Sequence, residues 1–312
     1  MKIAMTGATG FIGEHVRQKL QESYEVVTIG RRPSCELKAD LAEPESVSRL
    51  DLGGYDVLVH CAGVVDEDFY RDPYRAWAQA VLGFEELATR AVTYGVRQFI
   101  YFSTSHVYGS FKGIVSETRK PDPLSSYAIA HYAGEQILKR FAHRGDIGAV
   151  VLRPNAVYGV PLDWEAFDRW SLVPFDLPLQ AVYTGHITLK TTGQQRRNFI
   201  NACDLAFYVD KLLKKTEDFE RFVVVNPIGS ETMSIYNFAC QCATIFEETS
   251  GKICPVVRTE PTGSVDGEDF EFVSVMDEFR PVKHVNQFIK EFITKAIDKI
   301  QQGKSYGQSK NG

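Results

Sequence analysis

The sequence predicts an α/β protein with a doubly wound parallel sheet, and two patterns in the chain support this prediction. Short runs rich in β-branched residues recur through the first two thirds of the 312 residues, and segments with the apolar spacing of helices lie between them. Such strands are apolar on both faces, and their connections are as long as a helix. A parallel sheet covered by helices on both faces, with right-handed crossovers, is the arrangement that buries them.

The individual elements follow from these runs. Strands are expected at 2–6, 25–29, 56–60, 98–103, 149–153 and 222–226, and helices at 11–21, 74–94 and 127–143. The alternation lapses over 160–192, which is rich in aromatic residues and Pro, and again beyond 226. We therefore expect a sheet domain formed by 1–159 and 193–226 and a smaller substrate lobe formed by 160–192 and 227–301, interleaved with it in the sequence. Residues 302–312, rich in Gly, Ser and Lys, are predicted to be a mobile tail.

Composition and charge exclude several classes of protein. Hydrophobic residues make up 44% of the chain and charged residues 24%, which is the balance of a folded globular protein. The chain has 35 Lys and Arg residues and 40 Asp and Glu residues, which gives a net charge of -5. Its overall electrostatic field therefore does not favour binding to nucleic acid or to an anionic membrane. No stretch approaches the roughly 18 apolar residues that a membrane span needs, and we expect a cytoplasmic protein.

The six cysteines predict no metal site. They form no CxxC pair and have no histidine at the spacing of a zinc site. Cys240 and Cys242 lie two residues apart in an expected helix and so do not share a face. All six are interpreted as reduced thiols.

The turn between the first strand and the first helix carries a nucleotide-binding signal. Gly7, Gly10 and Gly13 lie three residues apart at this junction. Glycines here allow a tight turn, let backbone N–H groups approach a pyrophosphate and let the helix pack closely on the strand, while the helix N-terminus adds partial positive charge. The alternative is a simple glycine turn. We predict a Rossmann-type dinucleotide site contacted by Gly7, Thr9, Gly10, Phe11, Ile12 and Gly13.

The residues after the second strand indicate which cofactor is bound. NAD-binding chains usually offer Asp or Glu here to the adenosine ribose, whereas this chain has Arg31 and Arg32. A pair of guanidinium groups matches a 2'-phosphate, so NADP(H) is favoured. NAD(H) is the alternative, if the two arginines form only a solvated loop.

Several further motifs together resemble one family. They are Thr6-Gly-Ala-Thr-Gly-Phe-Ile-Gly13, Asp40-Leu41, His60-Cys-Ala-Gly63, Thr104 followed by Val107-Tyr-Gly109, Tyr127-Ala-Ile-Ala-His131, Leu152-Arg-Pro-Asn-Ala-Val-Tyr-Gly159 and Gln195-Arg-Arg-Asn-Phe-Ile-Asn-Ala-Cys-Asp204. The pattern covers residues 1–250 and is similar to that of the extended short-chain dehydrogenases/reductases, which include nucleotide-sugar epimerases, dehydratases and ketoreductases. The resemblance adds Asp40, Leu41, Cys61, Ala62 and Gly63 to the residues expected to contact the cofactor.

The resemblance implies a catalytic pair. Thr104 would hydrogen-bond the reacting oxygen and Tyr127 would act as general acid or base, because hydride transfer at a sugar carbon must be matched by proton transfer at its oxygen. In the family, a lysine one helical turn after the tyrosine lowers the pKa of the phenol and holds the nicotinamide ribose. This chain has His131 at that position.

The exchange of lysine for histidine leaves three hypotheses open. His131 shares a helix face with Tyr127 and is placed to reach the ribose, so both are expected to contact the cofactor. Imidazole is shorter than the lysine side chain, however, and is mostly neutral at pH 7, so it would help a phenolate less. The protein is then a working enzyme that uses histidine, a slow enzyme that needs other acid/base help, or a binding protein that has lost catalysis.

His106 bears on the second hypothesis. It lies two residues after Thr104, where relatives that resemble the GDP-fucose synthases carry an extra acid/base group for epimerisation. The alternative is a polar residue that lines the substrate pocket or packs beneath it. Sugar 4,6-dehydratases of the family have an Asp-Glu pair directly after the threonine, where this chain has Ser105 and His106, so water elimination is disfavoured.

The same resemblance assigns the substrate side. Asn155 and Arg197 match positions that contact the diphosphate of a sugar nucleotide, which needs donors of this kind. Thr104 and Ser105 are also expected to contact the substrate. Arg153 either assists them or only anchors the end of its strand.

A few other residues near the expected site either have two possible roles or differ from the residue that the family usually has. Asp204 is expected to order a turn rather than to meet substrate. Trp164, Phe167 and Trp170 either cover a base or sugar or form the core of the lobe. Ala80 stands where the family usually has Asn, so a hydrogen bond from helix to loop near the active site is expected to be missing.

Together these features predict an NADP(H)-dependent enzyme that acts on a nucleotide-activated sugar. Reduction of a 4-keto sugar in surface polysaccharide biosynthesis is the activity we expect first, because cellular NADPH favours net reduction. The alternatives are an epimerase with tightly held NAD(P) and a non-catalytic dinucleotide-binding module. A homodimer is expected. The nucleotide base, the sugar and the reacting carbon are not indicated by the sequence.

Overall fold

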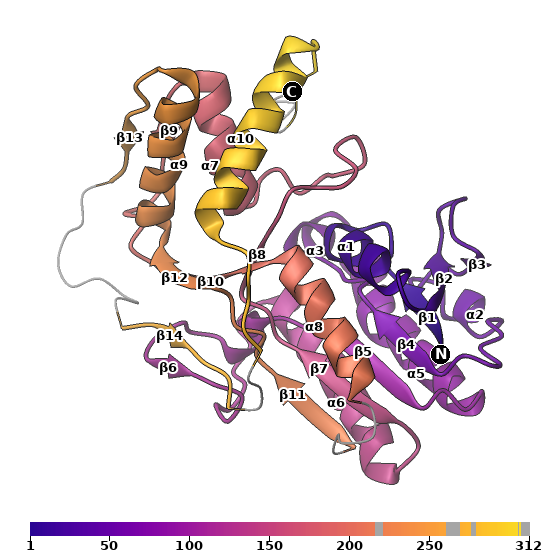
Figure 1. Cartoon of the computed structure of the whole chain (residues 1–312). Helices are drawn as coiled ribbons and strands as arrows, with labels where there is room; N and C mark the ends of the chain where they lie inside the picture. The colour runs from indigo at the N-terminus through magenta and orange to yellow at the C-terminus, as the bar shows by residue number, and fades with distance from the viewer. Residues whose placement is uncertain (216–220, 260–268, 276–278, 305, 307–312) are drawn as a thin grey trace.

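The computed structural model describes residues 1–215, 221–259, 269–275, 279–304 and 306. Its larger part is a sheet of seven parallel strands (Figure 1). The strands lie in the order β11 (Phe222–Val225), β7 (Gly148–Leu152), β5 (Gln98–Phe102), β4 (Val57–His60), β1 (Lys2–Thr6), β2 (Glu25–Gly30) and β3 (Leu37–Lys38). All six strands expected from the sequence are present in this sheet.

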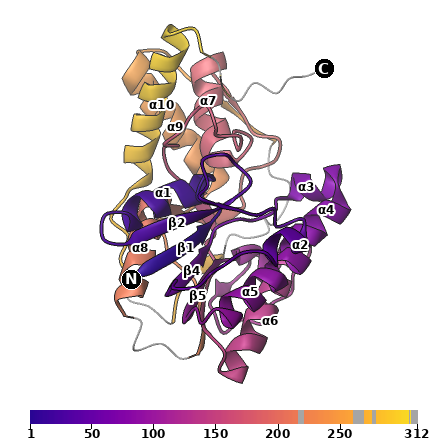
Figure 2. The same ribbon diagram turned by 90° about the vertical axis from the view of Figure 1, so that its right-hand side faces the viewer.

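Helices cover both faces of the sheet (Figure 2). On one face α1 (Phe11–Leu20) and α8 (Ala202–Lys214) pack against each other, and on the other lie α2 (Pro44–Val47), α5 (Gly83–Thr93) and α6 (Ser126–Arg144). Side chains alternate along β1, so Ile3 and Met5 pack into one apolar cluster and Ala4, between them, packs into the other. The doubly wound α/β fold predicted from the sequence is confirmed.

The strand order reverses at one point of this sheet. β2 and β3 lie on one side of β1, whereas β4, β5, β7 and β11 follow on the other side. The loops that leave the carboxyl ends of β1 and β4 therefore diverge to opposite faces and leave a crevice between them. A doubly wound sheet binds its ligands at such a crevice, and the glycine turn after β1 lies there.

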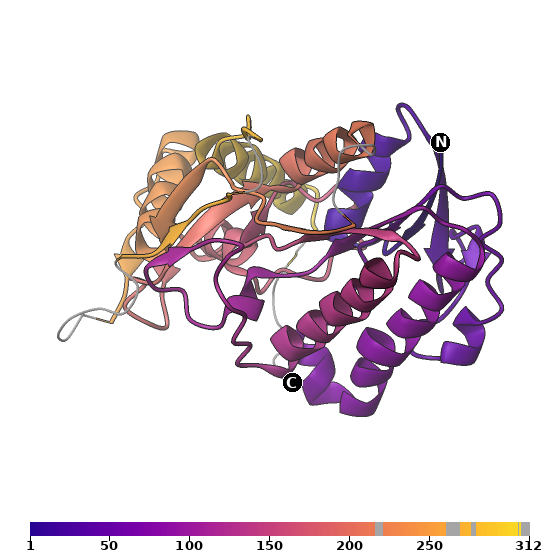
Figure 3. The same cartoon turned by 90° about the horizontal axis from the view of Figure 1, so that it is seen from below.

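The remaining chain forms a second part beside the sheet (Figures 1 and 3). β8 (Ala156–Tyr158), β10 (Arg196–Asn201) and β12 (Glu231–Ser234) form a separate sheet that shares an apolar cluster with α7 (Val173–Thr184), α9 (Ile235–Ser250) and α10 (Val285–Gln301). Short strands pair as β9 (Ile187–Thr188) with β13 (Val256–Val257) and as β6 (Ile114–Val115) with β14 (Glu271–Phe272). β10 lies between β8 and β12 and pairs with both, so these strands do not extend the large sheet. The division into a sheet domain and a lobe stays a prediction.

The aromatic segment between β8 and α7 contributes to the apolar core of this second part. Trp164 and Phe167 are buried, and the ring of Trp170 lies 5.2 and 4.5 Å from theirs. Of the two roles left open for these residues, Trp164 and Trp170 take that of a lobe core, to which Phe167 also contributes. Asp204 at the start of α8 accepts two backbone N–H groups of the chain just before α10, so it orders the chain there, as expected.

Only part of the predicted mobile tail, 302–312, is described. Tyr306 is buried; its N–H donates to the Tyr183 hydroxyl at 2.6 Å, and its own hydroxyl donates to Glu165 at 2.7 Å. Residues 305 and 307–312 lie outside the described residues, so mobility of the tail stays a prediction.

A buried ion pair joins α6 to the ends of two central strands. Glu135 of α6 accepts hydrogen bonds from the guanidinium of Arg153, which follows β7, and from the hydroxyl of Ser103, which follows β5. The side chains of Glu135 and Arg153 are only 1% and 4% exposed. The same guanidinium lies 4.7 Å from the centre of the Tyr108 ring. Arg153 therefore anchors the strand end, which is the second of the two roles considered for it.

Because both charges of this pair are buried, loss of one leaves the other uncompensated. We expect Arg153→Met to lower the free energy of unfolding by about 3–5 kcal/mol in urea denaturation, and Arg153→Met combined with Glu135→Leu to lower it by less. Arg140→Gln is the matched control, because its pair with Glu85 is 48% and 44% exposed and should contribute less than about 1 kcal/mol. Equal effects of Arg153→Met and Arg140→Gln would contradict the assigned role.

Candidate active site

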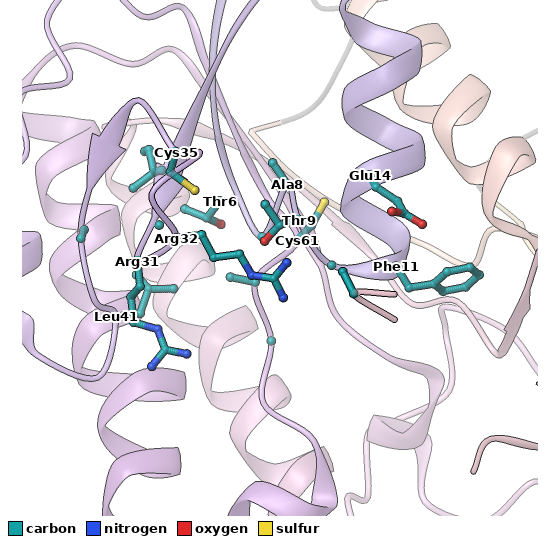
Figure 4. Close-up of a pocket in the computed structure, with 18 of the residues that line it drawn as sticks. Thr6, Ala8, Thr9, Phe11, Glu14, Arg31, Arg32, Cys35, Leu41 and Cys61 are labelled. Atoms are coloured by element: carbon teal, nitrogen blue, oxygen red, sulfur yellow. The ribbon is translucent and has the colours of Figure 1, made fainter. Parts of the chain in front are cut away.

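A cavity of about 330 Å³ opens at the crevice where the strand order reverses (Figure 4). The glycine turn after β1 and the loops after β2 and β4 bound it. Figure 4 shows Arg31 and Arg32 on one side of the cavity and Phe11 and Glu14 on the other. Most residues predicted to contact the cofactor line it, namely Gly7, Thr9, Gly10, Phe11, Arg31, Arg32, Asp40, Leu41, Cys61, Ala62 and Gly63.

Two glycines allow the turn that shapes this cavity. Gly7 has a φ of +68°, and a Cβ at this position would lie 2.3 Å from the backbone nitrogen of Ala62. A Cβ on Gly13 would lie 1.9 Å from the carbonyl oxygen of Gly7. The glycines therefore let the turn, the loop after β4 and the first turn of α1 approach one another closely. The start of α1 borders the cavity, and a pyrophosphate fits such a cradle.

The lining differs from the predicted set in two ways. Ile12 and Gly13 do not line the cavity, because Ile12 packs against an apolar cluster and Gly13 against the turn. The segment before α7, in contrast, does line it. Glu14 of α1 holds this segment by accepting the Leu162 N–H at 2.8 Å. Phe167, one of the aromatic residues considered for covering a base or sugar, lines the cavity as well as packing in the apolar core. The lining residues that the sequence did not indicate include Glu14, Gln79, Asp163, Ala166 and Asp168.

The end of the cavity near β2 is rich in positive charge. Arg31 and Arg32 are exposed and line it, and Asp40 forms ion pairs with both Arg31, at 3.7 Å, and Arg75. Lys38 donates hydrogen bonds to three carbonyl oxygens of the loop that carries Arg32. The two arginines are therefore presented to the cavity by a loop whose own backbone is held in place.

Thr104 and Tyr127 meet beyond the end of β5. Thr104 accepts the His106 N–H at 3.2 Å and so caps a short 3-10 helix (Ser105–Tyr108). Tyr127 lies in the first turn of α6, which Ser125 caps. The Thr104 side chain lies close enough to the Tyr127 hydroxyl to lower the pKa of that phenol. Burial raises the pKa of Tyr127 above its usual 10.0, although the Thr104 side chain acts in the opposite direction, so the phenol is protonated at neutral pH.

His131 lies next to Tyr127, with the two rings edge to face and their centroids 4.6 Å apart. Its Nδ1 is 2.9 Å from the Tyr101 hydroxyl, and the backbone of Val64 is a further hydrogen-bond partner. Burial lowers the pKa of His131 to about 4, so the ring is uncharged at neutral pH. The structure places the ring against Gly63, and neither His131 nor Tyr127 lines the cavity. His131 is thus near Tyr127, as predicted, but brings no positive charge to it.

His106 lies on the solvent side of Tyr127. Its ring is exposed, 5.9 Å from that of Tyr127 and 5.2 Å from that of Phe111. Desolvation by the surrounding side chains and the charge of Arg197 both lower the pKa of His106. Both roles considered for His106, an acid/base group and a residue that lines the substrate pocket, fit this position.

The residues expected to bind substrate are linked to one another. The Asn155 side chain donates to the Ser105 hydroxyl at 2.8 Å and accepts the Asn198 N–H at 2.9 Å. It therefore ties β10 to the 3-10 helix after Thr104. The guanidinium of Arg197, on β10, lies 4.7 Å from the centre of the Phe111 ring. Asn155, Arg197 and Ser105 are thus brought to the side of Thr104 and Tyr127 that His106 faces.

The helix expected at 74–94 has an irregular middle next to the site. A π-helical segment (Ala78–Leu82) separates α4 (Pro73–Trp77) from α5. Ala80 lies in this segment. Alanine at position 80 was expected to leave the helix without a hydrogen bond to the neighbouring loop. The structure nevertheless contains a bond of this kind, in which the Gln79 side chain donates to the Gly63 carbonyl at 3.3 Å. The amide side chain of Gln79, directly before Ala80, is the sequence feature from which this bond could have been predicted.

The chain belongs to the NAD dependent epimerase/dehydratase family, whose model matches residues 3–226. An uncharacterized UDP-glucose epimerase of Bacillus subtilis (strain 168), YtcB, is 27% identical over 274 residues, or 81% of this chain and 83% of that protein. The UDP-glucuronic acid 4-epimerase of Bacillus cereus in complex with NAD is 23% identical, with a TM-score of 0.76 over 98% of this chain and 99% of that one. RMD of Pseudomonas aeruginosa, complexed with NADPH, is 19% identical, with a TM-score of 0.77 over 96% and 99%.

The family match confirms two predictions from the sequence, namely the resemblance based on the motifs and an enzyme of the NAD(P)-dependent type.

Within the part of the chain that the structure describes, no group of three or more His, Cys, Asp and Glu side chains could hold a metal ion. All six cysteines are free. No helix among the described residues is both long enough and apolar enough to cross a membrane.

The buried imidazole leads to a prediction about pH. Folding lowers the pKa of His131 from 6.5 to about 4, so the unfolded chain takes up a proton that the folded chain does not. Stability present above pH 6.5 is therefore lost as the pH falls toward 4. We expect the His131 ring signals in NMR spectra not to titrate between about pH 5.5 and 8, and His131→Gln to reduce the loss of stability in acid. A titration midpoint of His131 close to 6.5 would contradict the neutral state.

Proposed function

We propose that this protein is an NADP(H)-dependent reductase that acts on a keto group of a nucleotide-activated sugar. The observation that carries the proposal is the state of Tyr127. Thr104 lies beside its hydroxyl, burial raises its pKa, and the His131 ring, whose centroid is 4.6 Å from that of Tyr127, is uncharged. A phenol in this state is a proton donor.

The direction of the reaction follows from this protonation state. Reduction of a ketone requires a proton at the carbonyl oxygen, and the protonated phenol of Tyr127 can donate it while Thr104 holds the same oxygen. Oxidation of an alcohol, with which an epimerase begins, requires the phenolate instead. The residue that stabilises the phenolate in the family is replaced here by the neutral His131. Reduction is therefore favoured over epimerisation.

The cofactor proposed is NADPH, which supplies the hydride when it is bound. The glycine turn and the start of α1 would hold the pyrophosphate, and Arg31 and Arg32 would pair with the 2'-phosphate. Asp40 is already paired with Arg31 and Arg75, so it offers less to a ribose hydroxyl than a free carboxylate would. Both cofactors occur on this fold, since the Bacillus cereus neighbour binds NAD and RMD binds NADPH.

A nucleotide-activated sugar is proposed as substrate because of the family and of the charge beside the catalytic pair. Arg197 supplies a cation for a diphosphate, and Asn155 and Ser105 supply polar groups next to it. A 4-keto sugar in the assembly of a surface polysaccharide is the specific case that we propose, for a cytoplasmic homodimer. The name of the Bacillus subtilis relative favours the epimerase alternative, in which His106 would be the additional acid/base group. The uncharged His131 favours the non-catalytic alternative.

Cofactor choice can be tested at the two arginines. We expect Arg31→Ala combined with Arg32→Ala to weaken NADP(H) binding by about 1–3 kcal/mol more than NAD(H) binding, because charge-assisted hydrogen bonds to the 2'-phosphate are lost. Titration calorimetry with both cofactors measures the difference. Arg71→Ala is the control, since that arginine is 78% exposed and paired with Asp68. Equal weakening of both cofactors, or tighter binding of NAD(H) by the unaltered protein, would contradict this assignment.

Activity can be tested with NADPH and 4-keto-sugar nucleotides that carry different bases. We expect the unaltered protein to consume one NADPH for each sugar reduced, and Tyr127→Phe to lower kcat by about 100-fold or more while NADPH binding stays nearly unchanged. Interconversion of two sugars without net NADPH consumption would support the epimerase. Cofactor binding with no turnover of any sugar nucleotide would support the binding module.

A further inference from the structure

One wall of the cofactor cavity is formed by the segment between β8 and α7. Residues 159–172, all of which the structure describes, form no helix or strand, and they line the cavity through Asp163, Ala166, Phe167 and Asp168. The position of such a wall depends on the contacts that hold it. We propose that Tyr306, near the C-terminus, is a positioning residue that packs against this wall and keeps it where it contacts the dinucleotide. The proposal rests on that part of the proposed function which places a dinucleotide in the cavity, and not on the reduction of a sugar.

Tyr306 packs between two tryptophans of this segment. It is 8% exposed, and its ring centroid lies 5.4 Å from that of Trp164 and 5.3 Å from that of Trp170. Trp164 precedes the lining residues 166–168 in the chain, and Trp170 follows them. The tyrosine ring therefore contacts the segment before and after the residues that face the cavity.

A series of ring contacts leads from Tyr306 to the glycine turn. The ring of Trp170 lies 4.5 Å from that of Phe167, and the ring of Phe167 lies 5.4 Å from that of Phe11. Phe167 and Phe11 both line the cavity, and Phe11 is the first residue of α1, where the pyrophosphate is expected. Because these rings are packed against one another, loss of the Tyr306 ring would allow both the wall and the Phe11 side chain to shift.

Hydrogen bonds hold Tyr306 in the same place. Its hydroxyl donates to Oε1 of Glu165 at 2.7 Å, and its N–H donates to the hydroxyl of Tyr183 in α7 at 2.6 Å. Lys304 forms an ion pair with the same oxygen of Glu165, but these two side chains are 46% and 62% exposed, so the pair contributes little. The packed ring of Tyr306, more than the ion pair of Lys304, is therefore the contact that holds the wall.

Two other contacts hold the wall to the part of the chain that carries the large sheet. Glu14 accepts the Leu162 N–H at 2.8 Å, and Nη1 of Arg169 lies 3.4 Å from Oε2 of Glu67. With these contacts intact, a protein that lacks the Tyr306 ring should keep its fold while its cavity wall is held less firmly. We therefore expect the loss of the ring to weaken cofactor binding without slowing the chemical step.

Cofactor affinity and turnover of variants at position 306 test the proposal. We expect Tyr306→Ala to raise the Kd for NADPH about tenfold in titration calorimetry, and Tyr306→Phe, which keeps the ring, to raise it by no more than about threefold. At saturating NADPH both variants should keep kcat within about twofold of the parent value. Tyr70→Ala, at a position that is 88% exposed, and Lys304→Met, which removes only the exposed ion pair, are the controls and should change the Kd by less than about twofold.

Tryptophan fluorescence measures the packing of Tyr306 without any cofactor. The chain has three tryptophans, so Trp77→Phe leaves only Trp164 and Trp170 as emitters. In this background we expect Tyr306→Ala to increase quenching of the emission by acrylamide about twofold, because the ring that covers both indoles is lost. Tyr306→Phe should leave the quenching close to that of the parent.

Two results would overturn the proposal. One is a Kd for NADPH of Tyr306→Ala that stays within about twofold of the parent value, whether or not the quenching changes. The other is a loss of kcat at saturating NADPH as large as the loss of affinity, which would indicate a general structural role. If no variant reduces any sugar nucleotide, the reductase function fails, whereas the affinities of the parent and of Tyr306→Ala still decide the role of Tyr306. A parent that binds neither NADPH nor NADH would refute both.

Discussion

The chemistry proposed for this site depends on the burial of an uncharged imidazole, that of His131, beside Tyr127. His131 is enclosed by Tyr101, Gly63 and the backbone of Val64, and a charged ring there would lose its hydration without gaining an anionic partner. Tyr127 is therefore kept as a phenol, which suits proton donation and hinders proton abstraction. The proposed direction of the reaction follows from this constraint.

The segment before α7 joins the second part of the chain to the cavity at the glycine turn. Glu14 of α1 accepts the Leu162 N–H, residues 166–168 line the cavity, and Arg169 then forms an ion pair with Glu67 of α3 (Asp66–Arg71). A dinucleotide bound at the glycine turn would thus contact a segment that is held at both ends by residues of the sheet domain.

Much of the fold and part of the site could be predicted from the sequence because both are encoded locally. Apolar periodicity predicted six of the seven strands of the large sheet, all except the two-residue strand β3. The glycine spacing predicted the position of the cavity. The direction of the His131 ring could not be predicted, because it depends on Tyr101, which the sequence marks only as a strand residue. The contact of Glu14 with Leu162 joins residues 148 positions apart and has no local signal. The absence of Asn at position 80 indicated a lost hydrogen bond, yet Gln79 makes a bond of this kind through the irregular turn of its helix.

The central claim is that Tyr127 works as a neutral acid with no titrating partner at position 131. The pH dependence of kcat/KM for NADPH-dependent reduction tests this most directly, because it reports the ionisation of the free enzyme. The account predicts a rate that is level from about pH 6 to 9 and that falls only where the phenol ionises, above its usual pKa of 10.0. A rate that changes tenfold with a midpoint between about pH 6 and 7, and that loses this midpoint in His131→Gln, would show that the imidazole is charged during catalysis and would contradict the account.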